Sequence, residues 1–193
     1  MDRAAAFYFD LASPEAYLSA ERILSLMPAP VEWVGVAGDE LAGEPDLPGE
    51  LETAGRLAGE RGLQPLRPPA RFPFDSRPAM LAATYARQVG RAVPFALAAW
   101  RQAFAAGRAL DEDGIVIAGS ACEMHPTALL KAIGTASVAT ALDEATVEAA
   151  RRGVLGVPAV WIAGEGDAPG TVFHGDHRLE DAACALGETV PAP

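Results

Sequence analysis

The fold is decided by the stretch from Phe7 to Leu18, which reads FYFDLASPEAYL. Its first three residues are aromatics that favour a β-strand, and an apolar pattern with helical spacing begins after Ser13 and Pro14. Serine is a preferred N-cap and proline is tolerated at the first helical position, so we expect a strand, a tight turn and a helix. The unsatisfied N–H groups of a helix start can stabilise an anion or a thiolate beside the Ser13 hydroxyl. The same residues are a common way to begin any helix, so a plain capping role for Ser13 stays open.

A second informative stretch covers residues 151–162 and reads RRGVLGVPAVWI. Arginines followed by a glycine indicate the end of a helix, and Pro158 then opens a short apolar strand. A Gly-Val-Pro turn is a reasonable candidate for a cis peptide bond, here Val157–Pro158. A further strand over residues 171–174 and a last helix from about Asp176 complete this end of the chain.

The segment between these two stretches reads as mostly helical. Residues 31–36 alternate like a strand, residues 37–50 indicate a loop, and the proline-rich residues 62–73 indicate a crossing loop. The pattern predicts helices near residues 50–61, 76–90, 93–106, 112–123, 126–133 and 136–152. Strands therefore lie at both ends of the chain with a long helical stretch between them, which is an α/β arrangement.

Composition narrows the class of protein further. The 193 residues fit one domain, and a net charge of -11 argues against nucleic acid or an anionic membrane as a partner. No apolar run approaches the roughly 20 residues needed to span a bilayer, and the start lacks a signal-peptide pattern, so we expect a cytoplasmic location.

The two cysteines, Cys122 and Cys184, fall in separate predicted helices and fit buried small hydrophobes. The sequence has no metal-ligand spacing, so we expect no metal.

These stretches resemble the DsbA-like thioredoxin-fold superfamily, in particular its branch of 2-hydroxychromene-2-carboxylate isomerases and kappa-class glutathione transferases. The resemblance rests on FYFDLASPEAYL near the start, on GVLGVP at 153–158 and on FHGDHRL at 173–179, with a weaker match at RFPFDS over 71–76. It implies a four-stranded mixed thioredoxin-like sheet with a large all-helical insertion. Residues 1–48 and 153–193 would form the core, and residues 49–152 the helical insertion and return helix.

The resemblance also implies site residues. In redox members a Cys-x-x-Cys pair occupies the turn after the first strand, and here those positions hold residues 13–16, SPEA, without a thiol. Ser13 would instead stabilise the thiolate of a bound cofactor, with glutathione or another low-molecular-weight thiol expected. Val157 and Pro158 would face that turn and bind the peptide-like part of the cofactor. The partner would be a small aromatic or electrophilic substrate, and the family resemblance suggests a homodimer.

Three positions depart from the family pattern. Glu15 adds a negative charge to the turn, where the family often has an aromatic residue. The acid that would hold the amino group of glutathione falls on His177, while Asp176 stands one residue earlier, so both are candidate cofactor-binding residues. In the middle motif, Phe72 and Asp75 are candidate substrate-binding residues, and Asp75 replaces an amide.

Three functional hypotheses follow from these residues. A thiolate that adds to a conjugated aromatic keto-acid and leaves again would make the protein an isomerase. A thiolate that stays attached to an electrophile would make it a transferase. A catalytically degenerate thioredoxin-fold binding protein is the third hypothesis, whereas a thiol–disulfide oxidoreductase would need the dithiol that the turn lacks.

Overall fold

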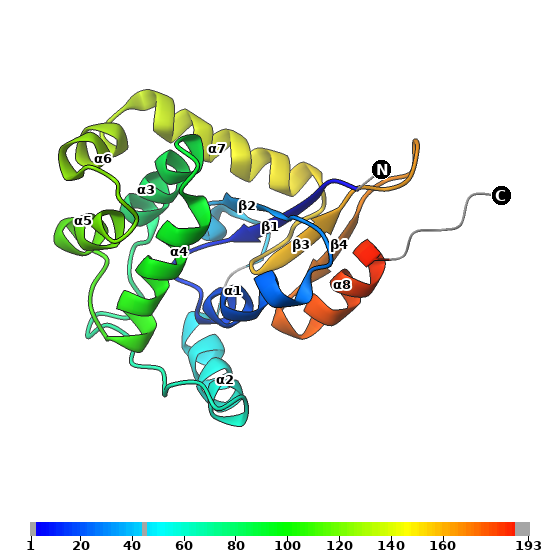
Figure 1. Ribbon diagram of the computed structural model, residues 1–193, viewed down its shortest axis with the longest axis horizontal. Helices are drawn as coiled ribbons and strands as arrows, with labels where there is room; N and C mark the ends of the chain where they lie inside the picture. Colours follow the sequence, from blue (N-terminus) through cyan, green and yellow to red (C-terminus); the bar gives the residue numbers. More distant parts are fainter. Residues whose placement is uncertain (1–2, 44–45, 188–193) are drawn as a thin grey trace.

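The centre of the molecule is a four-stranded mixed sheet in the order β2-β1-β3-β4, seen in a computed structural model that describes residues 3–43 and 46–187 (Figure 1). Strand β1 (Ala5–Phe9) pairs in parallel with β2 (Glu32–Gly35) and antiparallel with β3 (Ala159–Ile162), which pairs antiparallel with β4 (Thr171–His174). The two ends of the chain therefore meet in one sheet, and the predicted α/β fold class is confirmed.

Helix α1 (Pro14–Leu26) links β1 to the parallel strand β2, as a parallel pair requires. Between β2 and β3 the described chain holds helices and no strand: η1 (Gly38–Glu40), α2 (Leu47–Glu60), α3 (Arg77–Gln88), α4 (Ala92–Trp100), the π-helical turn η2 (Arg101–Ala105), α5 (Glu112–Ser120), α6 (Pro126–Ile133) and α7 (Ala136–Arg151). After β4, η3 (Asp176–Arg178) leads into α8 (Leu179–Gly187). The predicted helical ranges match these elements to within a few residues.

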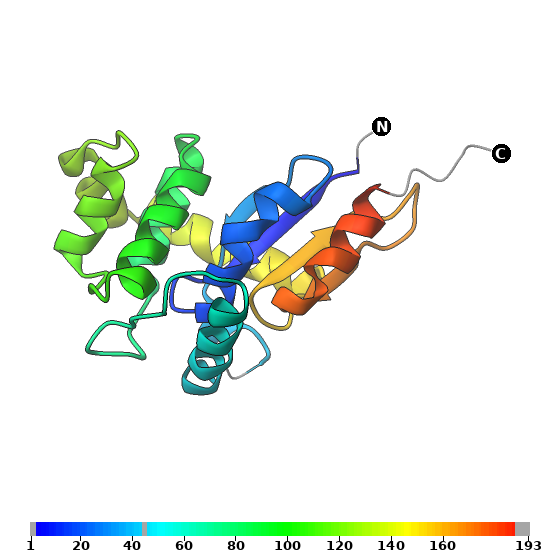
Figure 2. The same ribbon diagram turned by 60° about the horizontal axis from the view of Figure 1, so that its bottom comes forward.

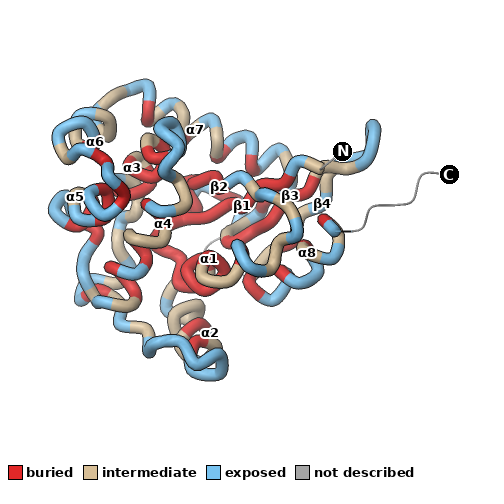
Figure 3. The backbone as a smooth tube through the Cα atoms, in the orientation of Figure 1, coloured by how far each residue is buried: buried red, intermediate tan, exposed pale blue. Residues whose placement is uncertain are grey.

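The two faces of the sheet are covered differently because side chains alternate along each strand. Figure 2 shows α1 and α8 on one face and α7 behind the other. Phe7 and Phe9 of β1 pack into the larger core with α1 and the helices α3 and α4, whereas Tyr8 packs with Ala149 of α7. Burial is complete along the central strand β1 and nearly so along β3, whereas only Phe173 of β4 is buried (Figure 3).

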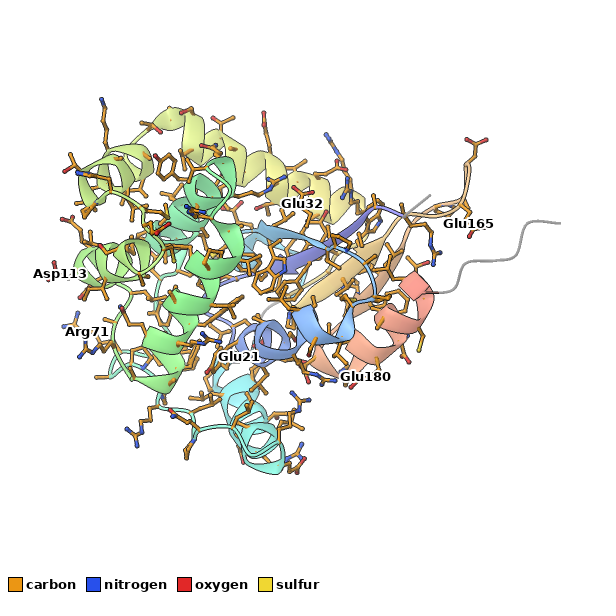
Figure 4. All side chains as sticks on the ribbon, in the orientation of Figure 1. Glu21, Glu32, Arg71, Asp113, Glu165 and Glu180 are labelled. Atoms are coloured by element: carbon orange, nitrogen blue, oxygen red, sulfur yellow. The ribbon has the colours of Figure 1, made fainter. Side chains whose placement is uncertain are left out.

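An aromatic cluster joins the sheet to the helical insertion. The ring of Trp100 in α4 lies 5.1 Å from that of Phe9 and 6.4 Å from that of Trp33. All three side chains are at most 2 % exposed, so the insertion and the sheet share one hydrophobic core. Asp113 and Glu165 lie at the periphery (Figure 4), whereas Asp10 and Asp176 are buried. Among the described residues, no helix is long and apolar enough to cross a membrane.

Candidate functional site

The turn after β1 is built around the buried carboxylate of Asp10. This carboxylate accepts hydrogen bonds from the backbone N–H of Ala12 at 2.7 Å and from that of Gly38 at 2.9 Å. Burial raises the pKa of Asp10, and these two hydrogen bonds act in the opposite direction. Asp10 thus fixes the start of α1 against the loop that follows β2.

Ser13 is the N-cap of α1, as the sequence predicts. Its extended backbone (φ -81°, ψ 116°) is followed by Pro14, and its Oγ accepts a hydrogen bond from the Ala16 N–H at 3.1 Å. Besides capping the helix, the Ser13 side chain donates a hydrogen bond from Oγ to Glu50 Oε2 at 2.9 Å. The hydroxyl therefore links the N-terminus of α1 to an acid from α2.

A cavity of about 430 Å³ opens beside Ser13. Its walls come from the turn after β1, from η1, from the start of α2, from the segment before α3 and from the loop before β3. Five of the lining residues carry carboxylates, namely Asp10, Asp39, Asp46, Glu50 and Asp75, and none of the described lining residues is Lys, Arg or His. The cavity is thus strongly acidic, which the sequence motifs did not indicate.

Glu50 is a second lining residue whose pKa is raised by its surroundings. Burial and the neighbouring carboxylates of Glu15, Asp10 and Asp46 raise its pKa to about 7, while the hydrogen bond from Ser13 acts to lower it. A carboxyl group with a pKa near neutrality can give and take protons at the pH of a cell. No local sequence signal marks Glu50, which lies 37 residues from Ser13 and reaches it only through the packing of α2 on α1.

The Val157–Pro158 peptide bond is cis, as predicted. Val157 lines the same cavity as Ser13, and its side chain lies near Gly38, where an added Cβ would stand 3.3 Å from Val157 Cγ2. The carbonyl of Pro158 accepts a hydrogen bond from the N–H of Gly175. The two separated motifs therefore both contribute to this cavity, the first through Ser13 and the second through Gly156 and Val157.

The middle motif contributes one of its two predicted side chains to the cavity. Asp75 lines the cavity, but Phe72 does not. The centroid of the Phe72 ring lies 5.8 Å from that of Phe104 and 6.2 Å from that of Phe74. Phe74 and Ser76 line the cavity instead. The Phe72–Pro73 bond is also cis, a feature that the sequence analysis missed.

Asp176 and His177 do not line this cavity. Asp176 is fully buried, and its carboxylate accepts hydrogen bonds from Ser19 at 3.2 Å, from Arg22 at 3.3 Å and from Arg61. Its backbone N–H donates to Glu15 at 2.8 Å, whereas His177 is exposed. Asp176 is engaged in joining α1 and the end of α2 to η3, and a role for Asp176 and His177 in cofactor binding stays a prediction.

The two cysteines do not form a redox pair. Cys122 is a buried free thiol in the turn after α5, and Cys184 is an exposed free thiol on α8. Burial raises the pKa of Cys122, which disfavours its reactive thiolate form. Within the ranges 3–43 and 46–187, no group of His, Cys, Asp and Glu side chains is arranged to hold a metal ion.

The four-stranded sheet and the cis-proline loop are those of a thioredoxin-like protein. Comparison with known protein families shows which family within this class the chain belongs to. The DSBA-like thioredoxin domain family matches residues 51–187, so the chain belongs to this family. No curated protein matches the chain significantly.

Among solved structures, a 2-hydroxychromene-2-carboxylate isomerase is similar with a TM-score of 0.79 and 22% identity, over 95% of this chain and 94% of that one. A probable DsbA oxidoreductase from Streptomyces coelicolor gives a TM-score of 0.73 at 19% identity, over 99% and 93% of the two chains. The cytosolic disulfide reductase DsbM from Pseudomonas aeruginosa with GSH gives 0.65 at 15% identity, over 95% of each chain. At these identities the likeness establishes the fold.

Proposed function

We propose that the protein is a glutathione-dependent enzyme, either an isomerase of the 2-hydroxychromene-2-carboxylate type or a transferase of the kappa-class type. The observation that carries this proposal is the Ser13 hydroxyl, which lies at the N-terminus of α1 beside a cavity that the cis-proline loop also lines. A helix start lowers the pKa of a thiol held there, from about 8.5 to as little as 3.5–7.5 in known cases. The similarity in fold to a 2-hydroxychromene-2-carboxylate isomerase and to a disulfide reductase solved with GSH supports the choice of thiol.

In this proposal the residues of the chain activate a thiol that they do not themselves supply. The turn after β1 has Ser13 and Ala16 where a dithiol would stand, so the nucleophile must come from a bound ligand. The thiolate attacks an electrophilic carbon of the substrate. In an isomerase the thiolate leaves again after bond rotation, and in a transferase the new carbon–sulfur bond remains.

The acidic lining bears on the substrate. Carboxylates at Asp39, Asp46 and Asp75 repel a substrate that itself carries a carboxylate, because none of the described lining residues offers a compensating positive charge. An uncharged aromatic electrophile meets no such repulsion. Within the proposal, the cavity therefore favours the transferase reaction on a neutral electrophile, and the two carboxylates of bound glutathione lie away from Asp39, Asp46 and Asp75.

The test measures thiolate formation and turnover with glutathione and a neutral aromatic electrophile. The parent protein should show thiolate absorbance in the ultraviolet near neutral pH, and Ser13→Ala should raise the apparent pKa of the bound thiol and lower turnover at least about tenfold, the loss expected when one charge-assisted hydrogen bond is removed. Ser13→Gly is the matched control, because it costs only a few tenths of a kcal/mol against about 1 kcal/mol for Ser13→Ala. Both variants should lose activity despite their different stabilities.

A specific observation supports a second candidate, a thioredoxin-fold binding protein that has lost catalysis. The carboxylate of Asp176 is held by Arg22 and Arg61 and does not line the cavity, so it is not available to hold the amino group of glutathione there. Failure of the parent protein to bind glutathione or a related thiol would favour this candidate. Unchanged thiolate formation and turnover in both Ser13 variants would leave Ser13 as a plain helix cap.

A further inference from the structure

The Ser13 hydroxyl has one proton, and this proton already forms a hydrogen bond with Glu50. Ser13 Oγ donates it to Glu50 Oε2 at 2.9 Å, while the Ala16 N–H occupies one of the acceptor positions of the same oxygen at 3.1 Å. A hydroxyl has one donor and two acceptor sites, so Ser13 cannot donate to a thiolate while it donates to Glu50. Activation of a thiol at this position therefore needs a change at Glu50.

The surroundings of Glu50 disfavour any added negative charge. Asp10 at the end of β1, Glu15 on α1 and Asp46 at the start of α2 are the acids that bear most strongly on Glu50. Asp39 and Asp75 line the same cavity. Glu50 also lines a smaller cavity together with Glu15 and Asp46, and neither cavity is lined by Lys, Arg or His among the described residues. A thiolate whose proton went to solvent would add a charge to this cluster.

We propose that Glu50 is the base that takes the proton of the incoming thiol, with Ser13 as the relay between them. This inference rests on the proposed function and adds a catalytic residue to it. The S–H bond breaks as its proton passes to Ser13 Oγ, and the proton that Ser13 held passes to Glu50 Oε2. The sulfur becomes a thiolate, Glu50 becomes a neutral acid, and the total charge of the cavity does not change.

After the proton transfer, every hydrogen-bonding site of the Ser13 hydroxyl has a partner. After the transfer, protonated Glu50 donates to Ser13 Oγ, the Ala16 N–H still donates to it, and Ser13 donates its one proton to the thiolate. Both acceptor sites and the donor site of the hydroxyl are then used. When the thiol leaves an isomerised substrate, the proton returns from Glu50 by the same route, and in a transferase it goes to the leaving group or to the developing anion on the substrate.

The acid–base properties of the two groups suit this exchange. The pKa of Glu50 is raised to about 7, whereas a free thiol has a pKa of about 8.5. The transfer is therefore unfavourable by only roughly 1.5 pKa units, or about 30-fold, before any stabilisation of the thiolate. The start of α1 and the Ser13 hydrogen bond act in the direction that closes this gap.

The test counts protons released to the buffer when glutathione binds as its thiolate. Calorimetric titrations in buffers of different ionisation enthalpy give this number, and ultraviolet absorbance gives the amount of thiolate. At about pH 8, where Glu50 is ionised in the free protein, thiolate formation should release close to zero protons, because the negative charge of the thiolate raises the pKa of Glu50 further and holds the transferred proton on it. At about pH 6, where Glu50 is already protonated, it should release close to one.

Two variants sharpen the comparison. Glu50→Gln has no group to take the proton, so each thiolate formed should release one proton at both pH values. Asp39→Asn removes one charge from the same cavity and should keep the pH dependence of the parent. Release of one proton at both pH values by the parent overturns the inference alone, since thiolate formation would still support the proposed function. A parent protein that binds no glutathione refutes the proposed function and this inference with it.

Discussion

Glu50 shows at the scale of one residue how the environment changes the behaviour of a common side chain. It lies in the first turn of α2, where a helix favours an acid, yet burial and three neighbouring acids raise its pKa to about 7. The local helix effect is therefore outweighed by the acids that tertiary packing brings close.

The raised pKa of Glu50 predicts how stability depends on pH. Because the folded protein binds this proton more tightly than the unfolded chain, the stabilisation is fully present below the unfolded pKa near 4.5 and is lost as the pH rises through about 7. The free energy of unfolding, measured by urea denaturation, should therefore fall between about pH 5 and pH 8, and Glu50→Gln should reduce this fall. An equally steep fall in the variant would assign the effect to another group, such as Asp10.

At the scale of elements, Asp176 connects parts of the chain that the sequence separates. Its side chain is 1% exposed and pairs with Arg22 of α1 and with Arg61 at the end of α2. Glu15 of α1 meets the backbone of the same residue. The contact fixes α1 and α2, which carry Ser13 and Glu50, against the segment that follows β4.

Asp176→Ala should therefore destabilise the protein strongly. Removing the buried carboxylate leaves the partly buried Arg61 without its ion-pair partner and Arg22 with Glu180 alone, and we expect a loss of about 3 kcal/mol in the free energy of unfolding, measured by urea denaturation. Asp181→Ala is the control, because Asp181 pairs with Arg178 at the exposed surface and its loss should cost less than about 1 kcal/mol. Equal effects of the two variants would mean that Asp176 does not join these elements.

At the scale of the whole molecule, the two cysteines belong to different parts of the fold. Cys122 follows α5 in the helical insertion and Cys184 lies on α8, and Figure 1 shows α5 and α8 far apart, at the left and the right of the molecule. One protein of similar fold is a probable DsbA oxidoreductase, but the turn after β1 of this chain has Ser13 and Ala16 and no thiol.

The protein should therefore not catalyse dithiol exchange. Reduction of insulin by a dithiol reductant should proceed at the background rate when the protein is present, because no thiol pair is available to form the mixed disulfide and resolve it. The double variant Cys122→Ser/Cys184→Ser is the control and should behave like the parent. Rapid insulin reduction by the parent that disappears in the double variant would contradict this prediction.

The sequence alone determined the features that depend on neighbouring residues. The aromatic run before Asp10, the Ser13-Pro14 helix start and the Gly-Val-Pro turn at 156–158 are local patterns, and the structure confirms the strand, the N-cap and the cis bond they predict. The periodicity of the middle stretch predicted its helices for the same reason.

Only the tertiary structure decided which side chains share the site. The contact between Ser13 and Glu50 spans 37 residues, and the pairing of Asp176 with Arg61 spans 115. Phe74 lines the cavity and the predicted Phe72 does not, and this difference depends on how the loop before α3 turns. Such contacts leave no periodic trace in the chain, because they arise from the packing of whole helices, and they set the charge of the cavity and the pKa of Glu50.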